Sequence, residues 1–102
     1  MAGQQYLYLT TIGHLSGNAH EIEIWYVPHA DCHYLISEKR EKAHWVQNIR
    51  ANPTITVRIG EHTFTGTASI PKEESLITTI KAKMDDKYNW SDGLVVQLCH
   101  DG

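Results

Sequence analysis

The chain is short of cysteine and of excess positive charge, and each shortage excludes a class of protein. Its two cysteines, Cys32 and Cys99, lie far apart and form no C-x-x-C pair. This pattern predicts neither a disulfide framework nor a zinc knuckle, and it favours a reducing compartment. The formal net charge is −3 at pH 7, which argues against a protein that binds nucleic acid by neutralising phosphates. We therefore expect no nucleic-acid partner.

The sequence also has no long hydrophobic run. No apolar stretch approaches the ~20 residues of a membrane-spanning helix, and the opening MAGQQYLYL carries no positive charge before its apolar residues. These features predict no membrane association and a cytoplasmic location. At 102 residues, of which 41% are hydrophobic, the chain has the size of one domain covering residues 1–102.

Short segments rich in β-branched and aromatic residues recur along most of the chain. They predict strands at residues 6–12, 20–28, 32–37, 54–60, 62–70 and 94–98. We expect the first three strands to form an antiparallel meander and the last to close the sheet. Gly66, inside one strand, predicts a bulge or a bend.

Two segments repeat apolar residues at helical spacing instead. Residues 41–51 place Trp45 and Ile49 on one face, which assigns both to the core, and residues 72–87 form an amphipathic helix. The order βββ-α-ββ-α-β predicts a small, mostly antiparallel barrel with helices outside it.

Seven histidines raise the question of a metal site. However, there is no H-E-x-x-H motif, no paired cysteines and no carboxylate at a known ligand spacing. We therefore predict no metal site and place most histidines in surface loops.

Several segments carry a resemblance to one family when their order and spacing are taken together. They read L-T-T-x-G-x-x-S-G, E-I-W-Y-V, H-W-V-x-N-I-R-A-N-P-x-I-T-V-R-I-G and T-F-x-G-T-A. The chain resembles the split-β-barrel flavin-binding proteins related to pyridoxamine-phosphate oxidase, and within them the deazaflavin-dependent nitroreductase and quinone-reductase branch. The likeness is good over residues 7–70 and weaker beyond. It implies a mainly β (α+β) fold, a six-stranded antiparallel split β-barrel with two flanking helices.

The resemblance also implies a homodimer that binds FMN or the deazaflavin F-420 in a groove between the barrels. The loop after the first strand would lie by the coenzyme's phosphate or polar tail, and the E-I-W-Y-V strand beside its ring. Relatives commonly have G-R-K-S-G in this loop, whereas here histidines replace basic residues, so anion binding should be weaker and pH-dependent. The implied coenzyme contacts in these segments are His14, Ser16, Gly17, His20, Ile24, Trp25 and Tyr26.

A second group of polar residues could supply the missing charge. It comprises Ser37, Lys39, Arg40 and Lys42, at the crossing where relatives place a serine and a lysine. The alternative is an ordinary solvated helix start whose charges pair along the helix. Tyr88 and Trp90 likewise leave two readings open, a packed loop covering the barrel end or a wall of the substrate pocket.

The resemblance implies an oxidoreductase that uses bound F-420 or FMN to transfer hydride to a small electrophilic acceptor such as a nitro compound, a quinone or an enone. No nucleophile–base pair or carboxylate dyad is visible, which accords with chemistry supplied by the coenzyme and leaves the catalytic residues unassigned. The alternatives are a coenzyme-binding module without turnover and a dimeric interaction module of the same fold.

Overall fold

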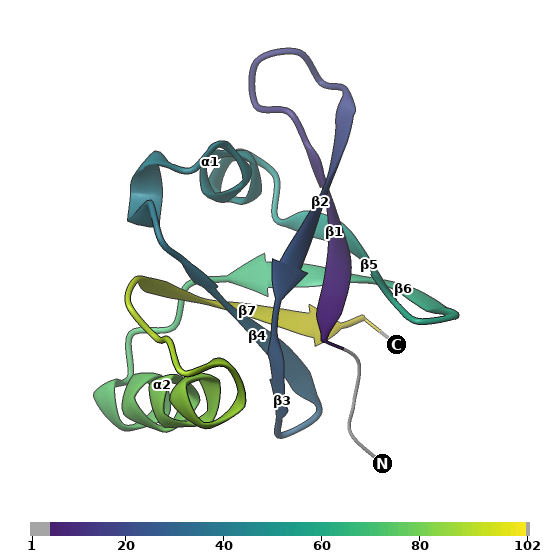
Figure 1. The fold of residues 1–102 in the computed structure, drawn as a ribbon. Coiled ribbons are helices and arrows are strands. Elements are labelled where there is room, and N and C mark those ends of the chain that lie inside the picture. Colours follow the sequence, from purple (N-terminus) through teal and green to yellow (C-terminus); the bar gives the residue numbers. More distant parts are fainter. Residues whose placement is uncertain (1–4, 102) are drawn as a thin grey trace.

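A curled, seven-stranded antiparallel sheet forms the body of the protein in the computed structural model, which describes residues 5–101 (Figure 1). Its strands are β1 (Tyr6–Ile12), β2 (Ala19–Trp25), β3 (Val27–His29), β4 (Cys32–Ser37), β5 (Thr54–Ile59), β6 (His62–Ser69) and β7 (Leu94–His100). Their order in the sheet is β2-β1-β5-β6-β7-β4-β3. The predicted antiparallel split-barrel fold class is therefore confirmed, with seven strands in place of six.

The additional strand arises at Tyr26, where the predicted strand 20–28 divides. β2 and β3 follow each other in the chain with only Tyr26 between them, yet they lie at opposite edges of the sheet. One residue therefore joins the two edges, and this connection requires the sheet to curl (Figure 1). The predicted meander of the first three strands is confirmed in its two pairings, β1 with β2 and β3 with β4, but it is interrupted at Tyr26, because β4 pairs with β3 and β7 and not with β2.

We call the junction at Tyr26 the seam. Tyr26 belongs to neither strand ladder, so its backbone needs other partners. Its N–H donates to the Tyr88 hydroxyl at 3.0 Å, and its carbonyl oxygen accepts from Lys87 Nζ, also at 3.0 Å. The Tyr88 hydroxyl lies 2.8 Å from the Tyr26 carbonyl oxygen and 2.7 Å from that of Gln5, so it can donate its one proton to either. Two side chains from one helix end therefore complete the backbone of the seam.

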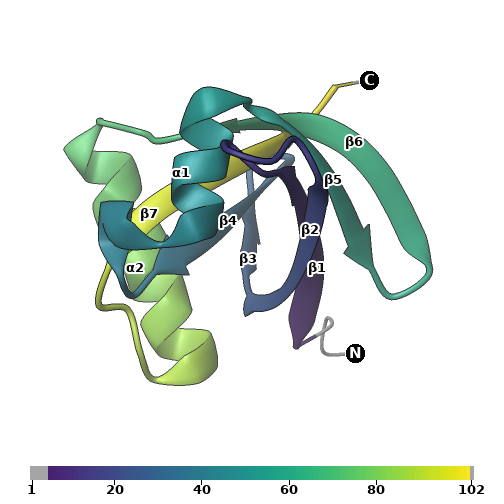
Figure 2. The same cartoon turned by 90° about the horizontal axis from the view of Figure 1, so that it is seen from above.

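The helices lie on different sides of the sheet. They are the 3₁₀ turn η1 (Arg40–Lys42), α1 (His44–Ala51) and α2 (Glu74–Tyr88). α1 packs over one end of the curl, and α2 lies outside it against β3 and β7 (Figure 2). The predicted helix 41–51 begins late because Ala43 is extended, with ψ of 136°. No helix within residues 5–101 is long and apolar enough to cross a membrane.

Two buried clusters hold these layers together. Inward-facing residues of the strands and α1 fill the curl, among them Leu7, Leu9, Leu35, Val46, Ile49, Val57 and Leu98. A second cluster lies between α2 and the outer face of the sheet and includes Val27, Tyr34, Ile36, Ile80, Met84 and Val95. Because successive side chains of a strand point to opposite faces, the strands contribute apolar residues to both faces of the sheet. Each face packs against a helix.

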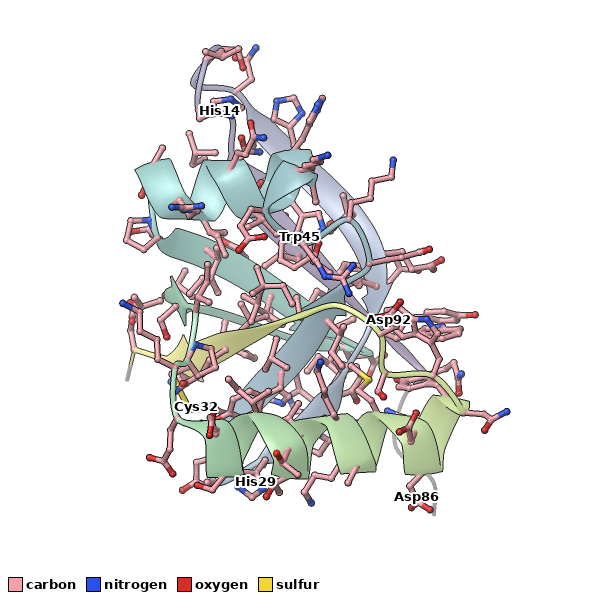
Figure 3. The ribbon with its side chains drawn as sticks, turned by 90° about the vertical axis from the view of Figure 1, so that its left-hand side faces the viewer. His14, His29, Cys32, Trp45, Asp86 and Asp92 are labelled. Carbon is pink, nitrogen blue, oxygen red and sulfur yellow. A yellow bond between two sulfur atoms is a disulfide. The ribbon has the colours of Figure 1, made fainter. Side chains whose placement is uncertain are left out.

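Cys32 and Cys99 form a disulfide between β4 and β7, near the start of α2 (Figure 3). The two residues are direct partners in the ladder, with Cα atoms 4.5 Å apart, a spacing typical of a non-hydrogen-bonded antiparallel pair. The expectation of unpaired cysteines was wrong because strand register, and not sequence spacing, decides which residues meet. The inference of a reducing compartment loses its basis.

Gly66 forms no bulge, which was one of its two predicted roles, and the predicted bend stays a prediction. Register is continuous through its pairing with Ile55, so no residue is inserted to make a bulge. A β-carbon at this position would collide with the carbonyl oxygen of Cys99 on β7. Glycine is therefore required by the close approach of two strands.

Removing the Tyr88 hydroxyl tests whether the seam needs it. Tyr88→Phe keeps the ring but leaves the Tyr26 N–H without its acceptor, and we expect the free energy of unfolding to fall by ~1–3 kcal/mol. Tyr8→Phe is the matched control, because it removes a hydroxyl that bonds Glu23 at an exposed position; we expect a change within about 0.5 kcal/mol. Urea denaturation measures both. Equal losses in the two variants would contradict a special role for the seam.

Candidate functional site

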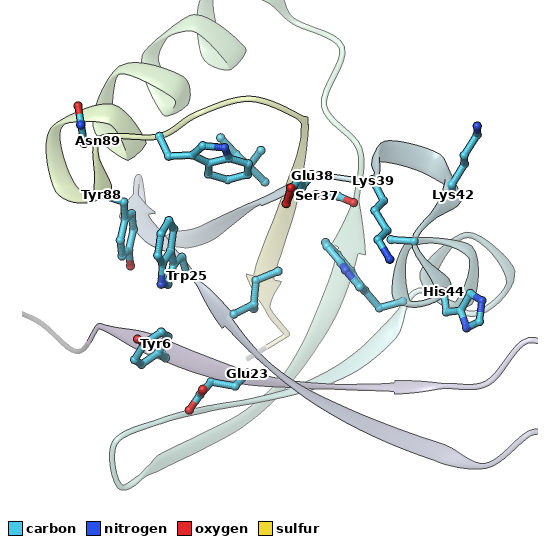
Figure 4. A pocket seen from close by; sticks show the side chains of 15 residues that line it. Tyr6, Glu23, Trp25, Ser37, Glu38, Lys39, Lys42, His44, Tyr88 and Asn89 are labelled. Carbon is cyan, nitrogen blue, oxygen red and sulfur yellow. The ribbon is translucent and has the colours of Figure 1, made fainter.

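The larger of two neighbouring cavities lies beside the seam. It has a volume of about 1000 Å³ and is bounded by the starts of β1 and α1, the ends of β2 and β4, and the segment that follows α2 (Figure 4). Ligand pockets commonly have volumes of roughly 300–1,000 Å³. We call it the main cavity.

Three aromatic side chains form one wall of the main cavity. The rings of Trp25 and Tyr88 stack with centroids 4.5 Å apart and planes 3° from parallel, and Trp90 meets Trp25 edge-on at 6.1 Å. Tyr88 is held by its bonds to the seam, and burial raises the pKa of its hydroxyl. Tyr88 and Trp90 therefore pack the barrel end and also line the cavity, and their role as a wall of the substrate pocket stays a prediction.

Basic residues lie at the other side of the main cavity. Lys39 and Lys42 both line it, and the Lys39 side chain points toward it (Figure 4). Arg40, between them, does not: it has a left-handed φ of 55°, and its guanidinium pairs with Asp92 at 2.9 Å in a solvent-exposed salt bridge. Ser37 is 2% exposed and donates its hydroxyl proton to the Arg40 carbonyl oxygen.

A second, smaller cavity of about 550 Å³ lies between the β1–β2 loop and α1. We call it the loop cavity. His14, Ser16 and His20 line it, and His44 and Trp45 line both cavities, so the two adjoin along these side chains. Trp45 packs against the core as expected, but it is only half-buried and its remaining surface separates the cavities.

The β1–β2 loop is closed by its own hydrogen bonds. Gly13 N–H donates to Asn18 O at 2.7 Å, Gly17 N–H to Gly13 O at 2.9 Å, and Asn18 N–H to the Ser16 hydroxyl oxygen at 3.1 Å. Gly17 has φ of 76°, a conformation that favours glycine. Its N–H is used inside the loop, so the glycines shape this loop without presenting those N–H groups to a ligand.

The structure groups most of the predicted site residues but not all. Ile24, Trp25, Ser37, Lys39 and Lys42 line the main cavity, and His14, Ser16 and His20 line the loop cavity. Three do not line either cavity: Gly17, Tyr26, which is 5% exposed and has its backbone engaged at the seam, and Arg40.

Sequence reasoning also missed several lining residues, among them Glu23, His44 and Asn48. Glu23 and His44 gave no recognisable signal. Asn48 did give one, because it lies three residues after Trp45 on the face of α1 that faces the core, where a polar residue is unusual. Within residues 5–101, no group of three or more histidine, cysteine or acidic side chains is arranged to hold a metal ion.

Comparison with known proteins supplies a family and a fold. Residues 1–92 match the family model described as F420H(2)-dependent quinone reductase. No curated protein matches the sequence. Among solved structures, a putative pyridoxamine 5'-phosphate oxidase from Listeria innocua is similar with a TM-score of 0.78 and 17% identity, over 96% of this chain and 85% of that one.

Two further structures share the fold. An F420-H2 dependent reductase has a TM-score of 0.74 and 20% identity, over 92% of each chain. A protein described as a domain-swapped dimer has a TM-score of 0.67 and 20% identity, over 95% of this chain and 81% of that one. Identities this low establish the shared fold alone.

Proposed function

Because the chain belongs to the F420H(2)-dependent quinone reductase family, we propose that it is an oxidoreductase that transfers hydride between F-420 and a small electrophilic acceptor, such as a quinone, a nitro compound or an enone. The observation that carries this proposal is the main cavity, with a stacked aromatic wall on one side and Lys39 on the other. FMN, the other coenzyme that the resemblance implies, is the comparison ligand in the tests below.

The residues present suit a flat coenzyme with an anionic tail. Trp25, Tyr88 and Trp90 offer a rigid aromatic surface on which a planar ring can pack. Lys39 and Lys42 offer positive charge on the opposite side, and the neighbouring loop cavity extends the site past His44 and Trp45. A ring in the main cavity with a tail directed toward the loop cavity would use both.

When bound, the deazaflavin supplies the hydride chemistry. The chain's own residues bind and orient. The Trp25–Tyr88 stack fixes one face of the cavity, and the tryptophan and tyrosine rings exclude water from it. Lysine side chains balance the charge of an anionic tail. These roles require position and electrostatics and no protein nucleophile, in keeping with a sequence in which no nucleophile–base pair is visible.

Neighbouring charge reversals test the proposed coenzyme site. Lys39→Glu removes a positive charge from the main cavity, so we expect F-420 affinity to weaken by ~1–3 kcal/mol, the scale of a charge-assisted hydrogen bond. Arg40→Glu makes the same charge change at the next residue, whose side chain faces Asp92, and should cost much less.

Fluorescence titration with F-420 and with FMN measures these affinities, and oxidation of reduced F-420 by a benzoquinone measures turnover. Failure of the unmodified protein to bind F-420 would contradict the proposal. Binding without turnover would favour a coenzyme-binding module instead. If Lys39→Glu and Arg40→Glu weaken F-420 affinity equally, the alternative that residues 37–42 are an ordinary solvated helix start is favoured.

We further propose that the protein is a homodimer. Leu15, at the tip of the projecting β1–β2 loop, is 90% exposed, and β2 is an edge strand along most of which the side chains are exposed or half-buried. An exposed apolar side chain beside an open strand edge suits a second copy of the chain. We expect sedimentation equilibrium at micromolar concentration to give twice the chain mass, and Leu15→Ser to weaken the dimer. A monomer mass for the unmodified protein would contradict this.

Histidines in place of the relatives' arginine and lysine predict a pH-dependent affinity. Histidine changes charge between about pH 5 and 8, and a bound anion favours its positive form. If His14 or His20 contacts the coenzyme's acidic tail, affinity should be highest at low pH and fall as pH rises from about 5.5 to 8.5.

His14→Arg and His20→Arg should remove that fall, because arginine keeps its charge. His62→Arg, at the exposed start of β6, is the control and should leave the profile unchanged. A flat profile in the unmodified protein, with neither loop variant binding better, would show that the loop holds no anion.

A further inference from the structure

Asn48 lies under the β1–β2 loop and makes three short hydrogen bonds, one buried and two partly buried. It is 4% exposed and sits in the middle of α1. Its Oδ1 lies 2.9 Å from the backbone nitrogen of His14 and 2.7 Å from Nδ1 of the same residue. Its Nδ2 donates to the Thr11 hydroxyl oxygen at 3.0 Å. The His14 end of the projecting loop stands above α1 in Figure 3.

The orientation of the Asn48 amide follows from one of these partners. The His14 backbone N–H can only donate, so the Asn48 atom that faces it must be the acceptor Oδ1. Oδ1 has no proton to give, and therefore the second contact requires His14 Nδ1 to be the donor. His14 thus carries a proton on Nδ1 whether its ring is neutral or charged.

A neutral imidazole has a single N–H. With that proton held on Nδ1 by Asn48, Nε2 of a neutral His14 has only a lone pair, which repels an anion. Nε2 becomes a donor only when the ring takes up a second proton and becomes positively charged. Without this constraint, a neutral histidine could place its proton on Nε2 and donate to an anion at any pH.

We propose that Asn48 is a positioning residue that makes His14 a proton-gated donor, able to hold an anionic group in the loop cavity only in its charged form. The identity of the anion, the acidic tail of the coenzyme, rests on the proposed function; the state of His14 does not. The other titratable groups lining this cavity are His20, Glu21 and His44.

The tautomer is tested first, on the protein alone. Long-range ¹H–¹⁵N NMR spectra at pH 8.5 distinguish which ring nitrogen carries the proton. We expect His14 to be protonated on Nδ1, in contrast to exposed His62, for which we expect the Nε2 tautomer of a histidine without a protein partner. An Nε2-protonated His14, or a mixture like that of His62, would overturn the inference, whatever the outcome for coenzyme binding.

Gating is tested by F-420 affinity against pH. In the unmodified protein, affinity should fall by up to about tenfold per pH unit above neutrality, the limit for one coupled proton. Asn48→Ala frees the ring to place its proton on Nε2, and the slope should flatten. Asn52→Ala, the same change at the end of α1 outside both cavities, should keep the original slope. Equal slopes in all three proteins would overturn the gating role.

These readouts separate the two proposals. If His14 has the Nδ1 tautomer but the protein binds no F-420, the proposed function is wrong and the state of His14 is still established. Inorganic phosphate then serves as the anion, and its effect on the NMR signals of the His14 ring is followed against pH. Phosphate that shifts those signals equally at pH 6 and pH 8.5 would overturn the gating role. If Asn48→Ala does not fold, the tautomer of the unmodified protein decides the inference.

Discussion

The hydroxyl of Tyr88 accepts the backbone N–H of Tyr26 at the residue where the two edges of the sheet are joined. A residue between two strands that belong to opposite edges can pair with neither ladder, and a buried unpaired N–H is costly. At the end of α2, the Tyr88 hydroxyl accepts this N–H and Lys87 donates to the carbonyl oxygen of the same residue. The same contact positions the Tyr88 ring against Trp25, so the bond that completes the barrel also builds the aromatic wall of the main cavity.

Most of the strands and helices could be predicted because they depend on local sequence patterns. Alternation gave the strands, and the spacing of Leu76, Ile80 and Met84 gave α2. The division at Tyr26 could not be seen, since alternation continues through it. Neither could the pairing of β4 with β7, and the Cys32–Cys99 disulfide depends on that register. Side-chain direction was equally hidden: the left-handed backbone of Arg40 turns its charge toward Asp92 and leaves Lys39 to face the cavity.

The positive charge at the site is arranged differently from what the family resemblance implies. The resemblance implies arginine and lysine in the loop, whereas this chain has His14 and Leu15 there, with His14 above the buried Asn48. Fixed positive charge lies instead beside the main cavity, on Lys39 and Lys42. Under the two proposals, the permanent positive charge lies at the main cavity and the proton-dependent charge at the adjoining loop cavity, so the strength of anion binding and its dependence on pH come from different residues.

The central claim is that the main cavity holds the coenzyme ring. The chain has three tryptophans, and all of them, Trp25, Trp45 and Trp90, line that cavity. Their indole N–H groups give separate NMR signals that report on a ring placed among them. Titration with F-420 should shift all three signals with one common affinity, while the backbone signals of the β5–β6 turn at Gly60 stay in place. Saturable binding that leaves the three indole signals unmoved would contradict the account.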